Sequence, residues 1–95
     1  MYLRITRASA SAGLDAEAVR GVSADAADTL KQQPGFVRFV SGANEEAGTA
    51  AIVTMWETLE AASFDRSILG PVIQRIADLG MTLATPEVYE VNVEL

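Results

Sequence analysis

Short segments of the chain alternate apolar and polar residues, the period of a β-strand. The first is 2–8, where Leu3 and Ile5 fall on one face and Arg4 on the other. Three further segments have strand character: 36–42, 49–56 and 87–95. The short polar turn 43–48 predicts that the second and third strands form an antiparallel hairpin.

Two segments have the helical period instead. Apolar residues recur at helical spacing in 14–32: Leu14, Ala18, Val22, Ala26 and Leu30. Pro34 ends this helix. A second helix is predicted over 57–81, capped by Thr58 and kinked or split at Gly70-Pro71. Its apolar set continues late in the segment: Val72, Ile73, Ile76, Leu79 and Leu83.

The order strand, helix, strand, strand, helix, strand predicts one α+β domain over 1–95. It is the ferredoxin-like βαββαβ order, with a four-stranded antiparallel sheet and both helices on one face. The third strand is apolar on both sides, with Trp56 on one and Val53 and Met55 on the other. Because helices cover only one face, the other needs a cover. A second copy of the sheet is the simplest cover, which predicts a homodimer.

Charge and missing residue types remove several functions. The net charge is -6, which disfavours nucleic acid as a partner. The chain has no Cys and no His, so thiolate chemistry, His-ligated haem and Ser-His-Asp catalysis are excluded for one chain. The sequence contains no apolar run of about eighteen residues, so it predicts no membrane span. No signal peptide is recognised at the start of the chain, so we expect a cytoplasmic protein.

Two local motifs carry a family resemblance. They are "PGF" at 34–36 and "MWETLEAASF" at 55–64. Together with the order and length of the segments, they resemble the antibiotic biosynthesis monooxygenase family, a branch of the dimeric α/β-barrel superfamily. The resemblance implies a homodimer with one cavity per subunit between sheet and helices. Some members oxidise polycyclic phenols with O₂ and no added cofactor, and others bind and degrade haem.

The haem-degrading branch has a residue pattern that this chain matches only in part. That branch uses an Asn on the first strand, a Trp at the end of the third, and a His on the second helix. Trp56 matches, but Thr6 or Arg7 stands near the Asn position and no His is present. We therefore expect no haem degradation and no cofactor.

Three residues are candidates for catalysis: Trp56, Arg38 and Asn92. Trp56 would stack on a flat substrate, or it anchors the core. Arg38 or Arg4 would stabilise a phenolate or enolate, and we expect the two to share a sheet face. The alternative for both is a solvated surface ion pair. Asn92 would position the substrate, or it is an edge residue satisfied by water.

Substrate contacts are expected from four residues: Arg4, Thr6, Phe64 and Ile68. The carboxylates at turns and helix starts have structural explanations, and no calcium-loop spacing occurs, so we expect no metal. Two functions remain open. One is a cofactor-independent monooxygenase acting on a phenol, anthrone or quinol. The other is a ligand-binding or accessory homodimer without chemistry.

Overall fold

The protein, described here by a computed structural model of residues 1–95, forms one antiparallel sheet covered by helices. The strands are β1 (Tyr2–Ser9), β2 (Phe36–Asn44), β3 (Thr49–Trp56), β4 (Thr82–Leu83) and β5 (Glu87–Glu90). The helices are α1 (Ala16–Leu30), α2 (Leu59–Ala62), the 3₁₀ turn η1 (Arg66–Leu69) and α3 (Pro71–Asp78).

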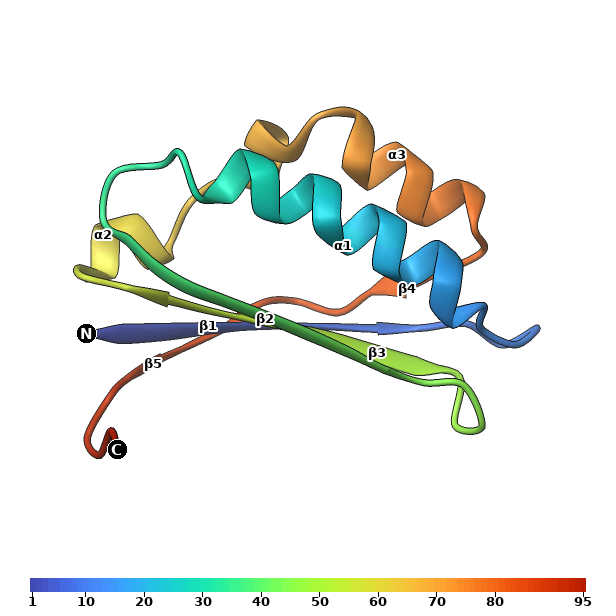
Figure 1. The fold of residues 1–95 in the computed structure, drawn as a ribbon, viewed down its shortest axis with the longest axis horizontal. Helices are drawn as coiled ribbons and strands as arrows, with labels where there is room; N and C mark the ends of the chain where they lie inside the picture. Colours follow the sequence, from blue (N-terminus) through green and yellow to red (C-terminus); the bar gives the residue numbers. More distant parts are fainter.

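The sheet runs in the order β2-β3-β1, and both β4 and β5 pair with β1 on its other side. Figure 1 shows α1 and α3 lying over the same face of the sheet. The ferredoxin-like prediction is therefore confirmed, with the last strand split into two pieces. The first helix and the hairpin also form as predicted, and β3 has the predicted bounds.

The second helical segment differs from its prediction. The break at Gly70-Pro71 is present, but the chain also leaves the helix at Ser63, and Asp65 then caps η1 by accepting a hydrogen bond from the Ser67 N–H. The prediction that Leu83 continues the helix is wrong. The chain turns at Gly80, whose φ of 76° suits glycine, and Leu83 enters β4.

The last strand is shorter than the predicted 87–95. It pairs antiparallel with β1, in a register that sets Glu90 opposite Tyr2. The Val91 N–H still donates to the Met1 carbonyl, but β1 has no residue opposite the positions beyond. Residues 91–95 therefore lack a neighbouring strand in the sheet and take no regular structure.

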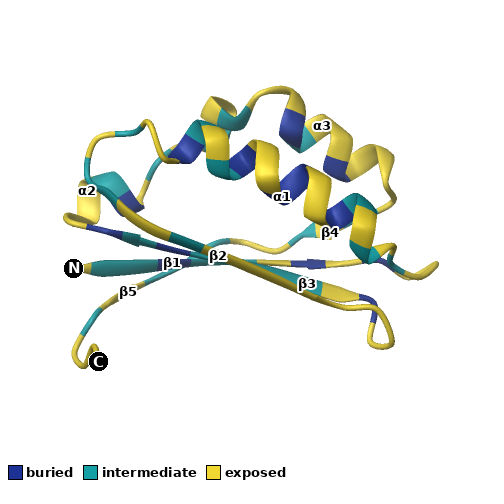
Figure 2. Ribbon diagram, in the orientation of Figure 1, coloured by how far each residue is buried: buried dark blue, intermediate teal, exposed yellow.

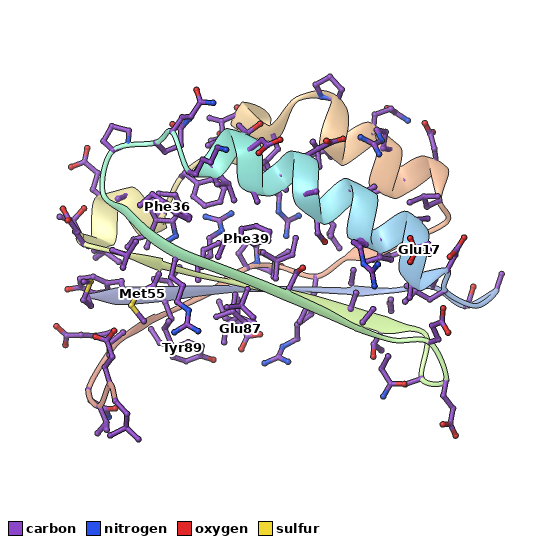
Figure 3. The ribbon with its side chains drawn as sticks, in the orientation of Figure 1. Glu17, Phe36, Phe39, Met55, Glu87 and Tyr89 are labelled. Atoms are coloured by element: carbon purple, nitrogen blue, oxygen red, sulfur yellow. The ribbon has the colours of Figure 1, made fainter.

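The strand register defines two faces of the sheet. The face beneath the helices carries residues from the three long strands: Tyr2, Arg4, Thr6, Ala8, Phe36, Phe39, Ile52, Thr54 and Trp56. Figure 3 shows Phe36 and Phe39 between sheet and helices. Figure 2 shows buried stretches recurring along α1 and α3, which lie over this face, and Val22, Ala26, Val72 and Ile76 of these helices form one core cluster.

The other face, which we call the open face, has no helix over it. It is apolar along its centre: Leu3, Ile5, Val40, Val53, Met55 and Tyr89. Val40 and Tyr89 are about half exposed. Figure 3 shows Tyr89 and Glu87 on the side of the sheet away from the helices. The open face matches the surface for which the sequence predicts a second cover.

Candidate functional site

Trp56 ends β3 at the centre of a second core cluster and has no exposed surface. Its indole N–H donates to the Thr54 hydroxyl at 2.7 Å, two residues back on the same face. Its ring meets Phe36 edge-on, with centroids 5.5 Å apart, and is tilted against Phe64 at 5.3 Å. The hydrogen bond and the two ring contacts give Trp56 the features of a core anchor, because its one donor is already used.

Arg4 is the unusual residue on the helix-covered face. Its side chain lies beneath the helices and the residue is only 5% exposed. Nη1 donates to the carbonyls of Ala62 at 3.1 Å and Phe64 at 2.8 Å. The guanidinium carbon lies 3.8 Å from the centre of the Phe64 ring. Arg4 thus joins β1 to the linker between α2 and η1.

One buried donor atom of Arg4 has no partner. Nε is buried and makes no hydrogen bond. Most buried polar atoms in proteins are satisfied, and an exception calls for an explanation such as a bound water or ligand. The unpaired N–H of Arg4 is therefore the first indication of a binding site beneath the helices.

A small cavity lies beside Arg4, and we call it the Arg4 cavity. Its volume is about 30 Å³ and its lining is mostly apolar. The polar and aromatic side chains in its wall are Arg4, Thr6, Thr54, Phe64 and Arg66. A neighbouring cavity, also of about 30 Å³, shares four lining residues with it: Thr6, Ile52, Ile76 and Leu83.

The side chains that line the Arg4 cavity carry a net positive charge. Burial, and then the charge of Arg66, lower the pKa of the Arg4 guanidinium, while Asp65 raises it. An arginine stays protonated despite such shifts, so the site keeps its cation. Hydrogen bonds from Ser67 lower the pKa of Asp65, which therefore remains an anion and accepts a proton poorly.

The residues expected to form a site are only partly brought together. Arg4, Thr6 and Phe64 line the Arg4 cavity. Ile68 lies on η1, is 36% exposed, and is not part of that lining. Asn92 lies beyond β5 and is exposed. Trp56 stands behind Phe64 rather than in the cavity wall.

The expectation that Arg4 and Arg38 share a sheet face is wrong. Arg4 pairs with Thr54 across the β1–β3 ladder, whereas Arg38 pairs with Met55. A β-bulge between Phe36 and Arg38 inserts one residue into β2 and so reverses the direction of the residues that follow. Arg38 is exposed on the open face, away from the Arg4 cavity.

Two contributors were not singled out from the sequence. The Thr54 hydroxyl accepts the hydrogen bond of the Trp56 indole N–H. The sequence could have indicated this contact, because Thr54 is two residues from Trp56 and residues i and i+2 of a strand share a face. Arg66 gave no signal, because its position depends on the break between α2 and η1. Its side chain reaches back to donate to the Ala84 carbonyl.

With this geometry in view, the chain can be compared with known proteins. No protein-family model and no curated protein matches it. Solved structures do. SnoaB from Streptomyces nogalater, a cofactor-independent oxygenase, superposes with a TM-score of 0.74 at 19% identity, over 99% of this chain and 95% of that chain. A candidate antibiotic biosynthesis monooxygenase from Deinococcus radiodurans gives 0.71 at 20% identity, over 100% and 96%.

A variant of MhuD with two manganese protoporphyrin IX molecules per active site gives a TM-score of 0.68 at 23% identity, over 100% of this chain and 98% of that chain. This chain has their fold. The resemblance to the antibiotic biosynthesis monooxygenases is thus confirmed at the level of architecture, and the chemistry of each relative remains a statement about that relative.

A porphyrin does not fit the residues present. Haem iron in proteins is held by His, Cys, Met or Tyr. The chain has no His or Cys, and neither Met nor Tyr lines the Arg4 cavity. No group of three or more potential metal-ligating side chains occurs.

None of the helices has the length and apolar character needed to cross a bilayer.

Proposed function

We propose that the chain is a cofactor-independent monooxygenase that oxidises a small electron-rich aromatic, a phenol, anthrone or quinol, with O₂ in the Arg4 cavity. The observation that carries this proposal is Arg4 itself. A buried guanidinium with a free Nε, flanked by an aromatic ring and apolar walls, is suited to hold an anionic oxygen on a flat molecule.

The proposed oxidation requires the protein to supply little beyond the positive charge of Arg4. For an anthrone, loss of one CH₂ proton gives an enolate, which passes one electron to O₂. The substrate radical and superoxide then combine into a peroxide at that carbon. Loss of the second proton from the carbon breaks the O–O bond. One oxygen stays as the new carbonyl and the other leaves as water.

Each residue has a separable role in this proposal. Arg4 stabilises the enolate and the developing peroxide, because a desolvated cation acts strongly on nearby charge. Phe64 supplies an aromatic wall beside the guanidinium, and Thr6 supplies a hydroxyl. Trp56 supports Phe64 from behind and keeps the wall in place. The proposal therefore assigns anion stabilisation to Arg4 and not to Arg38.

The site must open to admit a ligand. A volume of about 30 Å³ is far below the roughly 300 Å³ at which ligand pockets begin. The linker 63–65 is the element positioned to move, because it is short, belongs to no helix or strand and carries Phe64, and of its residues only Phe64 accepts a hydrogen bond from Arg4. Joining the Arg4 cavity to its neighbour would add further room.

Oxygen uptake tests the proposal. Purified protein is expected to accelerate O₂ consumption with an anthrone, with one water formed per quinone and no metal, flavin or haem added. An oxygen electrode and product mass spectrometry with ¹⁸O₂ measure this. The absence of catalysed uptake across anthrones, quinols and phenols would argue against the enzyme.

A second candidate function is a ligand-binding homodimer without chemistry. It is favoured by one observation: no His, Lys or carboxylate lines the Arg4 cavity to act as a base. Ligand binding by calorimetry with no oxygen uptake would select this alternative.

The proposed assembly is a homodimer through the open face. In light scattering at micromolar concentration we expect a mass of about twice 10.1 kDa. Val53→Glu places a charge at the centre of the open face and is expected to give monomers, because a buried unpaired carboxylate is costly. Ala24→Glu makes the same change on the exposed side of α1 and should remain dimeric. A wild-type monomer would contradict this assembly.

A further inference from the structure

The Arg4 cavity contains a second guanidinium. Arg66, the first residue of η1, lines the same space as Arg4. The side chain of Arg66 also donates to the Ala84 carbonyl, and this hydrogen bond fixes its position. No acidic residue lines the cavity. Two cations therefore border one apolar space without an anion in its wall.

This arrangement is costly while the cavity is empty. Like charges repel, and the repulsion grows where water is excluded. The positive charge of Arg66 contributes to lowering the pKa of Arg4. Asp65 opposes this effect, but its carboxylate accepts the Ser67 N–H at 2.8 Å and is not part of the wall. A ligand that brings its own negative charge would relieve the repulsion.

We propose that the Arg4 cavity selects ligands that are already anionic, planar aromatics bearing a carboxylate or an ionised phenol or enol, and that Arg66 is a specificity residue holding that charge together with Arg4. This inference rests on the proposed function and deepens it. It also removes the need for a general base in the first proton loss. An acidic substrate ionises in water, and the site accepts the ion.

The two arginines divide the work by their geometry. Arg4 keeps Nη1 on the carbonyls of Ala62 and Phe64, which leaves the buried Nε, together with Nη2, for the ligand. Arg66 lines the cavity from η1, directly after the linker that carries Phe64. Because the guanidinium of Arg4 covers a face of the Phe64 ring, a ligand ring would lie beside Phe64, where it can place an anionic oxygen between two planar donors, the arrangement that charge-assisted bonds favour.

A matched pair of ligands tests the charge. 2-Naphthoate and its neutral isostere 2-naphthamide have the same ring and nearly the same shape. Isothermal titration of the wild-type protein at pH 8 and constant ionic strength is expected to show at least about 10-fold tighter binding of the carboxylate, since hydrogen bonds to charged groups are roughly twice as strong as neutral ones.

Three variants locate the effect. Arg66→Gln is expected to lose most of the preference for 2-naphthoate while binding 2-naphthamide nearly as well as wild type. Arg66→Lys keeps the charge and should retain part of the preference. Arg20→Gln removes a surface arginine whose ion-pair partner is Glu17, and should leave both affinities unchanged. Thermal unfolding of each variant confirms that it is folded.

The outcomes separate the two proposals. Equal binding of the two ligands by wild type, or an equal loss of both in Arg66→Gln, would overturn the selection for anions while leaving the cavity as a ligand site. Failure of both ligands and of neutral phenols to bind would instead count against the proposed function.

Discussion

Replacing Arg4 with Gln is expected to lower the rate of anthrone oxidation by about 100- to 1000-fold, the usual effect of removing one preorganised donor to a developing anion. Gln keeps a polar donor near the position of Arg4 Nε, but it has no charge for the enolate and is too short to reach the carbonyls that Nη1 holds. Arg4 is the one buried arginine, and its Nε is free. The loss should appear in kcat more than in KM, because the charge develops along the reaction.

Arg7→Gln is the matched control for this variant. Arg7 lies three residues along β1, on the open face, where it pairs with Glu87 at 2.8 Å. That pair is exposed, so its loss should have little effect on rate or stability. Equal losses in the Arg4 and Arg7 variants would show that charge on β1, rather than the Arg4 cavity, supports the reaction.

Replacing Trp56 with Ala is expected to destabilise the protein by about 3–5 kcal/mol, as for other fully buried large aromatics. The substitution removes the contacts with Phe36 and Phe64 and leaves the Thr54 hydroxyl without its donor. A domain of this size is stable by only about 5–15 kcal/mol, so much of the margin would be lost. Urea unfolding followed by circular dichroism measures the change.

Leu79→Ala provides the comparison for Trp56→Ala. Leu79 is the C-cap residue that follows α3 and is 41% exposed, so its truncation should cost no more than about 1 kcal/mol. A cost for Trp56→Ala that does not exceed that of Leu79→Ala would mean that the ring is not the anchor that its burial indicates.

The strands and the first helix were predictable because local rules decide them. Alternation placed β1, the apolar segment 49–56 predicted β3, and the spacing of apolar residues placed α1, whose Asp15 cap is a local interaction. Alternation also separated Arg4 from Leu3. It could not show which of the two faces the helices cover, and the face with Leu3 and Ile5 turned out to be the open one.

The site was less predictable because it depends on two non-local features. Without the bulge in β2, Arg38 would lie opposite Thr54 and share the face of Arg4, as the sequence suggested. One inserted residue changes that outcome. The break between α2 and η1 likewise decides where Phe64 and Arg66 point. The sequence did not reveal this break, because the apolar and polar residues on either side of it continue one helical pattern.

The most direct test of a binding site at Arg4 is a crystal structure of the protein grown with 1-naphthol. We expect the naphthol oxygen within hydrogen-bonding distance of Arg4 Nε, the ring against Phe64, and the linker 63–65 displaced. A larger hollow of about 540 Å³ lies at the other end of the sheet, lined by residues such as Arg7 and Asn44. Naphthol bound only there, with the Arg4 cavity unchanged, would contradict the account.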